Sequence, residues 1–173
     1  MKILLNILLI ILFLGYSKNE EMISLKCMVE ITDYRGEGAY FSISIIDDKN
    51  LYLKTVYVLG TDKTWFSEMK SFWKHLKIND LYLDDEFYPL IEGISGPTIS
   101  GGETRILQLK IPKLLYNKTN RLRFETAVED KGYYTDDINV ELNNKSLNKS
   151  YQGNGFIRNI KFILPVKLSL IHI

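Results

Sequence analysis

The feature that most constrains this chain is a period-two alternation of apolar and mostly polar residues, which is typical of β-strands. Two segments near the start, residues 25–32 and 39–45, show it clearly. Because successive side chains of a strand point to opposite faces of a sheet, each segment predicts a strand that buries one face. The side chains expected inside are Leu25, Cys27, Val29, Ile31, Ala39, Phe41, Ile43 and Ile45.

Five more strand-like segments follow, separated by clusters of Asn, Asp, Gly, Lys and Ser that favour turns. The polar sequence at 47–50, for example, suits a hairpin turn. Strands in this number, with one short helix among them, predict a mostly β fold and a single β-sandwich domain. The predicted strands are 25–32, 39–45, 51–59, 103–111, 122–128, 138–142 and 156–164.

The period changes to that of a helix between residues 64 and 76. We predict a short amphipathic helix there that lays one face on the sheet. His75 falls on its charged side. The apolar residues that recur three or four positions apart are Trp65, Met69, Phe72, Trp73 and Leu76.

Residues 1–17 have the composition of a cleavable export signal. Lys2 provides a positive start, residues 3–15 are apolar but for one Asn, and Ser17 ends a small-residue cleavage site. The apolar run is shorter than the roughly 20 residues that a membrane span needs. We therefore predict cleavage after Ser17 and an extracytoplasmic domain of residues 18–173, periplasmic or secreted, without a membrane span. The alternative is that the uncleaved segment stays as an anchor.

Charge and cysteine content exclude several kinds of partner and site. Removing the signal takes away Lys2 and no acidic residue, which leaves 21 of the 22 basic residues against 21 acidic ones. Nucleic acid is not expected as a partner, because phosphate binding needs clustered Lys and Arg. Cys27 is the only cysteine, so it cannot form an internal disulfide and is expected to be a small buried side chain.

The sequence contains no recognisable catalytic or metal-binding constellation. Ser95 lacks the glycine two residues later that a nucleophile elbow needs, since Pro97 stands there. The two histidines, His75 and His172, have no Cys, Asp or Glu at the spacing of a metal site. We therefore predict no catalytic residue, no metal site and no cofactor.

Residues 78–102 contain two prolines and four glycines, too many for a continuous helix or strand. We expect a long loop, and functional residues favour loops that a rigid scaffold holds. Its acids Asp84, Asp85 and Glu86, together with Glu103 just beyond it, would be the candidate groups of a carbohydrate site, because glycoside chemistry uses paired carboxyl groups.

Four segments together carry a family resemblance: a strand that ends in an acidic turn, a Trp-bearing helix, a Gly-rich loop and a strand with two glutamates. They are residues 40–48, 64–73, 95–102 and 124–132. In this order they resemble the exported bacterial family known as domain of unknown function 2271, over residues 27–142. The resemblance implies an immunoglobulin-like antiparallel β-sandwich with one short amphipathic helix inserted, similar to the sandwich of flagellar hook-cap proteins. It also implies neighbours among small envelope domains and flavin-transferring enzymes.

The same resemblance marks residues of a candidate ligand or partner surface. The chain departs from the family pattern at Val128, where an Arg commonly precedes the second glutamate, and at Asn120 and Arg121, where Gly and Tyr are usual. A function that depends on the missing Arg is therefore not expected. The candidate residues are Trp65, Trp73, Thr98, Gly101, Glu125 and Glu129.

Together these observations predict a non-catalytic binding or interaction module that is exported to the bacterial cell envelope. We expect an envelope protein as its partner, in the context of a flavin or metal redox system, and this expectation rests on fold analogy. The alternative is a carbohydrate-active or carbohydrate-binding domain with its site in residues 78–102.

Overall fold

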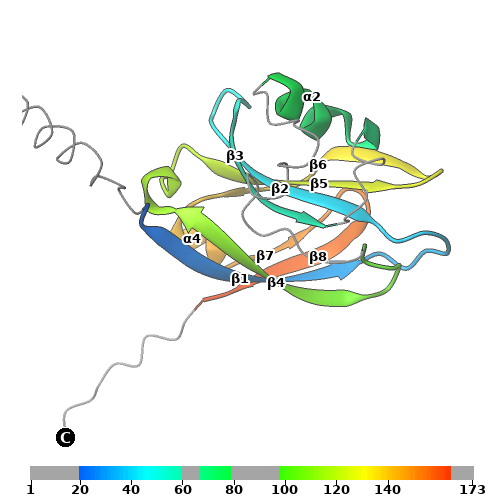
Figure 1. Ribbon diagram of the computed structural model, residues 1–173. Coiled ribbons are helices and arrows are strands. Elements are labelled where there is room, and N and C mark those ends of the chain that lie inside the picture. The colour runs from blue at the N-terminus through cyan, green and yellow to red at the C-terminus, as the bar shows by residue number, and fades with distance from the viewer. Residues whose placement is uncertain (1–19, 60–66, 79–97, 165–173) are drawn as a thin grey trace, which may run out of the picture.

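The computed structural model describes residues 20–59, 67–78 and 98–164, which form two stacked β-sheets and a covering helix (Figure 1). The predicted export signal, Trp65 and most of the predicted loop at 78–102 lie outside these ranges. The elements in chain order are β1 Met22–Ile31, β2 Tyr40–Ile46, β3 Tyr52–Leu59, α2 Lys70–Ile78, β4 Thr104–Pro112, a 3-10 turn Lys113–Leu115, β5 Arg121–Val128, β6 Gly132–Glu141, α4 Asn144–Leu147, β7 Ser150–Gln152 and β8 Ile157–Ile163.

The strands of the described ranges divide into two four-stranded sheets, and every pairing is antiparallel. The first sheet has the order β4-β1-β8-β7 and the second has the order β3-β2-β5-β6. The sheets stack face to face, and α2 lies over the outer face of the second sheet (Figure 1). The predicted mostly β sandwich with one short inserted helix is confirmed.

The core between the sheets comes from the strand faces that the alternation predicts. All eight side chains expected inside from residues 25–32 and 39–45 are buried. Phe41 of β2 and Phe124 of β5 meet edge to face at the centre, with ring centroids 6.0 Å apart. Each fully buried Leu, Ile or Phe contributes roughly 1.5–3 kcal/mol to folding. Burial also raises the pKa of the Cys27 thiol to about 12, which keeps this only cysteine protonated and inert.

The structure departs from the sequence predictions at three places. α2 begins at Lys70, after a short turn at residues 67–68, and not at residue 64. β6 begins at Gly132 and not at residue 138, because pairing with β5 extends a stretch that has no apolar alternation of its own. The polar stretch after β6 forms α4 and β7, which no apolar pattern marked. The Asn143 side chain starts α4 by accepting a hydrogen bond from the Ser146 N–H at 2.9 Å.

A buried aspartate ties the edges of the two sheets together. Asp137 of β6 is fully buried and accepts hydrogen bonds from the Thr126 hydroxyl at 2.5 Å, the Gly155 N–H at 2.8 Å and the Ile157 N–H at 3.0 Å. Gly155 belongs to the β7–β8 connection of the opposite sheet, and Ile157 is the first residue of β8. A Cβ atom at Gly153 would lie 2.4 Å from the Asp137 carboxyl group, so only glycine fits there. Asp137 therefore fixes how β6 sits against the β7–β8 hairpin.

We expect Asp137→Ala to lower the free energy of unfolding by about 2–4 kcal/mol, because it leaves two buried N–H groups without an acceptor. Urea unfolding followed by circular dichroism measures the change. The matched control is Asp48→Ala in the exposed β2–β3 turn, for which we expect a change of less than about 0.5 kcal/mol. Equal stabilities of the two variants would contradict the proposed role of Asp137.

Candidate functional site

Helix α2 is held on the outer face of the second sheet by a small apolar cluster. Met69, Phe72 and Leu76 are fully buried against Val58 of β3 and Ala127 of β5. Met69, directly before the helix, and the helical residues Phe72 and Leu76 are three or four positions apart, so they form one stripe that faces the sheet. The half-buried side chain of Trp73, one of the predicted surface residues, packs at the border of this cluster.

A buried carboxyl group lies beneath the first turn of α2. Glu125 of β5 is fully buried and accepts a hydrogen bond from the Tyr133 hydroxyl of β6. The Tyr133 oxygen in turn accepts from the Ser71 N–H at 3.0 Å, and the Phe72 N–H also donates to the Glu125 carboxyl group. We call these four residues the Glu125 cluster. In it, Glu125 and Tyr133 accept hydrogen bonds from the N–H groups of Phe72 and Ser71, which lie at the helix start and have no partner within the helix.

The protonation of Glu125 is set mainly by burial. Desolvation raises its pKa to about 8, although the hydrogen bonds from Tyr133 and from the Phe72 backbone oppose the rise. The second oxygen, Oε1, is buried and has no hydrogen-bond partner in the described part of the chain. An unpartnered buried oxygen is less costly on a neutral carboxyl group than on a carboxylate. At neutral pH the neutral form therefore predominates.

This shift predicts a pH-dependent stability. The folded-state pKa lies above 4.5, the ordinary value of a glutamate side chain, so Glu125 takes up a proton on folding at intermediate pH. Its contribution is complete below about pH 4.5 and is lost as the pH rises through about 8, at no more than about 1.4 kcal/mol per pH unit. Urea unfolding at pH 5, 6, 7 and 8 measures this slope.

We expect Glu125→Gln to reduce that slope, because the amide has no proton to lose. The matched control is Glu129→Gln, just beyond the end of the same strand, which leaves Glu125 in place and should keep the wild-type dependence. A slope that is the same in Glu125→Gln as in the wild type would show that burial of Glu125 is not its source.

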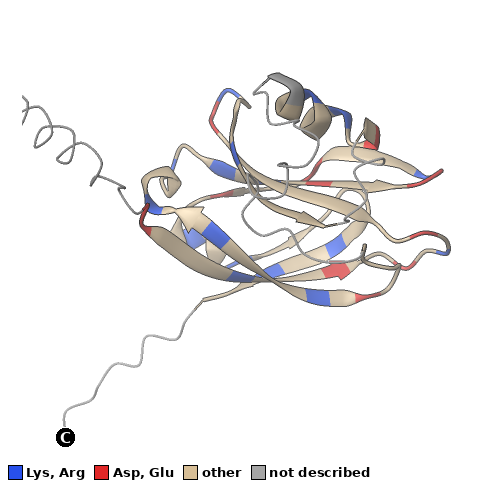
Figure 2. Cartoon of the chain, in the orientation of Figure 1, with Lys and Arg blue, Asp and Glu red and all other residues tan. Residues whose placement is uncertain are grey.

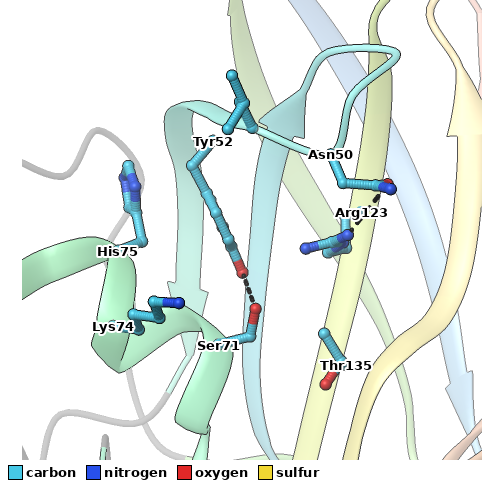
Figure 3. A pocket seen from close by; sticks show the side chains of 8 residues that line it. Asn50, Tyr52, Ser71, Lys74, His75, Arg123 and Thr135 are labelled. Carbon is cyan, nitrogen blue, oxygen red and sulfur yellow. Dashed lines mark hydrogen bonds between the residues drawn. The ribbon is translucent and has the colours of Figure 1, made fainter. Parts of the chain in front are cut away.

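Beside the Glu125 cluster, a cavity of about 510 Å³ opens between α2 and the sheet (Figure 3). We call it the helix–sheet pocket. Tyr52 of β3 stands in it, with its ring stacked on His75 at 4.3 Å between centroids and its hydroxyl 3.4 Å from the Ser71 hydroxyl. The described residues that line the pocket are Asn50, Leu51, Tyr52, Ser71, Lys74, His75, Arg123 and Thr135.

Arg123 brings a nearly buried positive charge to the pocket wall. It is 6% exposed, and its guanidinium carbon lies 5.5 Å from the centre of the Tyr52 ring. Its Nη2 donates to the Asn50 side chain at 3.3 Å, and its Nε lies 3.1 Å from the Asp136 carboxylate. Asn50 holds a left-handed turn conformation, with φ at 64°, and the Asp47 carboxylate accepts two backbone N–H groups of that turn.

His75 lies differently from its predicted place on the charged side of the helix. It is 8% exposed and stacks on Tyr52, because it follows the buried Phe72 by three positions and so borders the apolar stripe. Burial lowers its pKa, which favours the neutral ring at neutral pH. His75 thus belongs to the pocket wall, a place that the sequence analysis did not give it.

The other predicted surface residues are spread over the molecule. Trp65 lies outside the described residues, and Glu129 lies half-buried just beyond β5. Thr98 accepts a hydrogen bond from Arg105 through its carbonyl oxygen at 3.1 Å. Gly101 passes so close to Tyr34 that a Cβ atom would lie 2.2 Å from its carbonyl oxygen. Of the six candidates, the structure places Trp73 and Glu125 at α2, and a role for any of them in a ligand or partner surface stays a prediction.

Arg123 is missing from the candidates of the sequence analysis, although the sequence pattern points to it. The inward side chains Leu122 and Phe124 imply that Arg123 faces outward beside the candidate Glu125, so two ionisable groups lie on a strand face that a predicted helix would cover. No pattern in the sequence points to Tyr52 as a residue of the site.

The described residues show neither a cluster of metal-binding side chains nor a membrane-spanning helix. Within residues 20–59, 67–78 and 98–164, no group of three or more His, Cys, Asp or Glu side chains is placed to hold a metal ion. No helix in those ranges is long and apolar enough to cross a membrane.

Comparison with known proteins identifies one family. The family model described as "Predicted periplasmic protein (DUF2271)" matches residues 22–159, which include every strand from β1 to β7 and all the described residues that line the helix–sheet pocket. No curated protein and no solved structure matches the chain.

Proposed function

Because the chain belongs to the DUF2271 family of predicted periplasmic proteins, we propose that it is a non-catalytic binding module of the cell envelope. Its ligand site is the helix–sheet pocket. The observation that carries the proposal is the convergence of Arg123, Lys74, Ser71 and Thr135 on one cavity of about 510 Å³. Ligand sites are commonly concavities of roughly 300–1,000 Å³ with a few convergent polar groups.

The pocket is built so that a ligand would meet fixed groups. Its walls come from the strands β3, β5 and β6, a hairpin turn and the helix, and sites on such elements hold their side chains more accurately than loops do. The Glu125 cluster fixes the start of α2 directly beside the pocket. For a binding role these residues need only hold a ligand, and no nucleophile or acid–base pair is required of them.

The carbohydrate alternative has less support from the described residues. Its candidate acids Asp84, Asp85 and Glu86 lie outside them. Glu103 is exposed, pairs with Arg105 at 3.3 Å and accepts the Ser100 N–H at 3.0 Å, a local arrangement that fits a turn. No carboxylate occurs among the described residues of the pocket lining, whereas glycoside hydrolysis uses two.

The narrower context that we propose is an envelope protein partner belonging to a flavin or metal redox system. It rests on the family resemblance and on export. Cross-linking of the protein on intact cells, followed by mass spectrometry, tests it. A cross-linked partner that contains neither flavin nor metal would show that the proposed redox context is wrong, while the proposal of a binding module would still hold.

Blocking the pocket tests the proposed function. Thermal unfolding of the full chain is measured with inorganic phosphate, citrate, flavin mononucleotide and maltose. We expect at least one compound to raise Tm, because a ligand that binds only the folded state stabilises it. Thr135→Trp fills the pocket and should abolish that rise. The exposed rim variant Leu51→Trp should weaken it.

The matched control is Thr104→Trp, the same substitution at an exposed position of β4 in the other sheet, which should keep the rise. A shift that survives in both Thr135→Trp and Leu51→Trp would place the ligand elsewhere. If none of the four compounds raises Tm, the proposed function is wrong for these ligand classes.

A further inference from the structure

We propose that the helix–sheet pocket binds an oxyanion, a carboxylate or phosphate group of a small molecule, between Arg123 and Lys74. The inference rests on the proposed function, since it names the class of ligand for the same pocket. It comes from the hydrogen-bonding capacity that these two cations leave unused.

Arg123 keeps a donor nitrogen unused. A guanidinium group has five N–H donors and cannot lose its charge. Nη2 donates to Asn50, and the Nε contact with Asp136 is an ion pair that does not meet hydrogen-bond geometry. Nη1 donates to no group in the described part of the chain. Figure 3 shows a guanidinium nitrogen of Arg123 pointing away from Asn50, toward Tyr52 and Ser71.

Lys74 approaches the same space from α2. Its side chain is exposed and makes no ion pair with any described residue. In Figure 3 its ammonium group extends toward the hydroxyl groups of Tyr52 and Ser71. The two cations therefore reach the pocket from opposite walls, the sheet and the helix. An oxyanion between them would accept from a planar guanidinium and a point-like ammonium at once.

The charges around the pocket favour an anion over a neutral ligand. Asp136, the acid that pairs with Arg123, is 53% exposed at its side chain, so water screens it more than it screens Arg123. Glu125 lies on the same strand face and is mainly neutral at pH 7 because burial raises its pKa to about 8. Arg121 adds a further positive charge nearby through its hydrogen bond to Asn50 at 3.0 Å.

This positive character is local. Both basic and acidic residues are spread over the described chain (Figure 2), and the net charge of the whole sequence is only +1. A long polyanion needs a continuous row of basic side chains, and the described residues do not concentrate basic charge without acidic residues among them. A small anion needs only the pair Arg123 and Lys74.

Isothermal titration of the full chain with inorganic phosphate and with citrate tests the inference, with maltose as the neutral probe. We expect one or both anions to bind and Lys74→Gln to weaken the affinity about tenfold, as the loss of one charge-assisted hydrogen bond does. Arg123→Lys keeps the charge but loses the guanidinium geometry, and it should weaken binding by a similar factor. Raising the NaCl concentration should weaken binding in the wild type.

The matched control is Lys70→Gln, an exposed lysine of the same helix that does not line this pocket, and it should bind like the wild type. Binding of phosphate alone or of citrate alone distinguishes a phosphate-bearing from a carboxylate-bearing ligand. Anion binding that is unchanged in both Lys74→Gln and Arg123→Lys would overturn the inference.

If maltose bound in a manner blocked by Thr135→Trp, and none of the three oxyanions (phosphate, citrate and the phosphate-bearing flavin mononucleotide) bound or competed, the inference would be wrong while the proposed function held. If no compound bound at all, both would fail. The two ideas are therefore separable in one set of measurements.

Discussion

The burial of Glu125 beneath the first turn of α2 is the interaction on which the site depends. Apolar packing of Phe72 and Leu76 brings the helix to the sheet, but it is non-directional and tolerates sliding. Hydrogen bonds from Tyr133 and Phe72 to one carboxyl group fix a single position, since each broken bond would leave a buried polar group unpaired. The pocket beside this cluster exists only in that position of the helix.

β5 shows how one strand serves both the fold and the site. Its inward residues Leu122 and Phe124 belong to the core between the sheets. Its outward residues Arg123 and Glu125 are just as buried, because α2 covers that face. Because successive side chains of a strand point to opposite faces, the core residues and the site residues of β5 lie on different faces. A substitution on the outer face can therefore alter the pocket while the sandwich core stays intact.

The sandwich could be predicted because its determinants are local. Period-two alternation in residues 25–32 and 39–45 needs no knowledge of distant residues, and the side chains that it places inside are buried. The prediction of one buried face is wrong for β2, because the outward residues Ser42 and Ser44 are buried as well. The pocket could not be predicted in the same way, because Tyr52, His75 and Arg123 come from three elements that only tertiary packing brings together. Glu125 is a candidate residue of the sequence analysis only through the family resemblance. The alternation places it on the outer face of its strand and does not by itself predict that it is buried.

The mistaken side of His75 has a physical origin in the helix. A helix that starts at residue 64 has an apolar stripe through Trp65, Met69 and Leu76, and His75 lies outside that stripe. The helix starts at Lys70, and Tyr52 reaches up from β3 to stack on His75. An imidazole ring beside an apolar stripe, such as that of His75, becomes buried when an aromatic side chain of another element stacks on it. Sequence periodicity describes one helix and cannot report such a partner.

Two ionisable groups under α2, two positions apart on β5, meet the cost of burial in different ways. Glu125 becomes neutral, which removes most of its desolvation penalty. Arg123 has no such route, since a guanidinium group stays charged. Its contact with the acid Asp136 is half exposed on the Asp136 side and does not meet hydrogen-bond geometry. Replacing it with an apolar residue of similar size is the change that stability alone would favour. The proposed anion, entering the cavity from outside, would account for an arginine at the cavity wall with a donor left over.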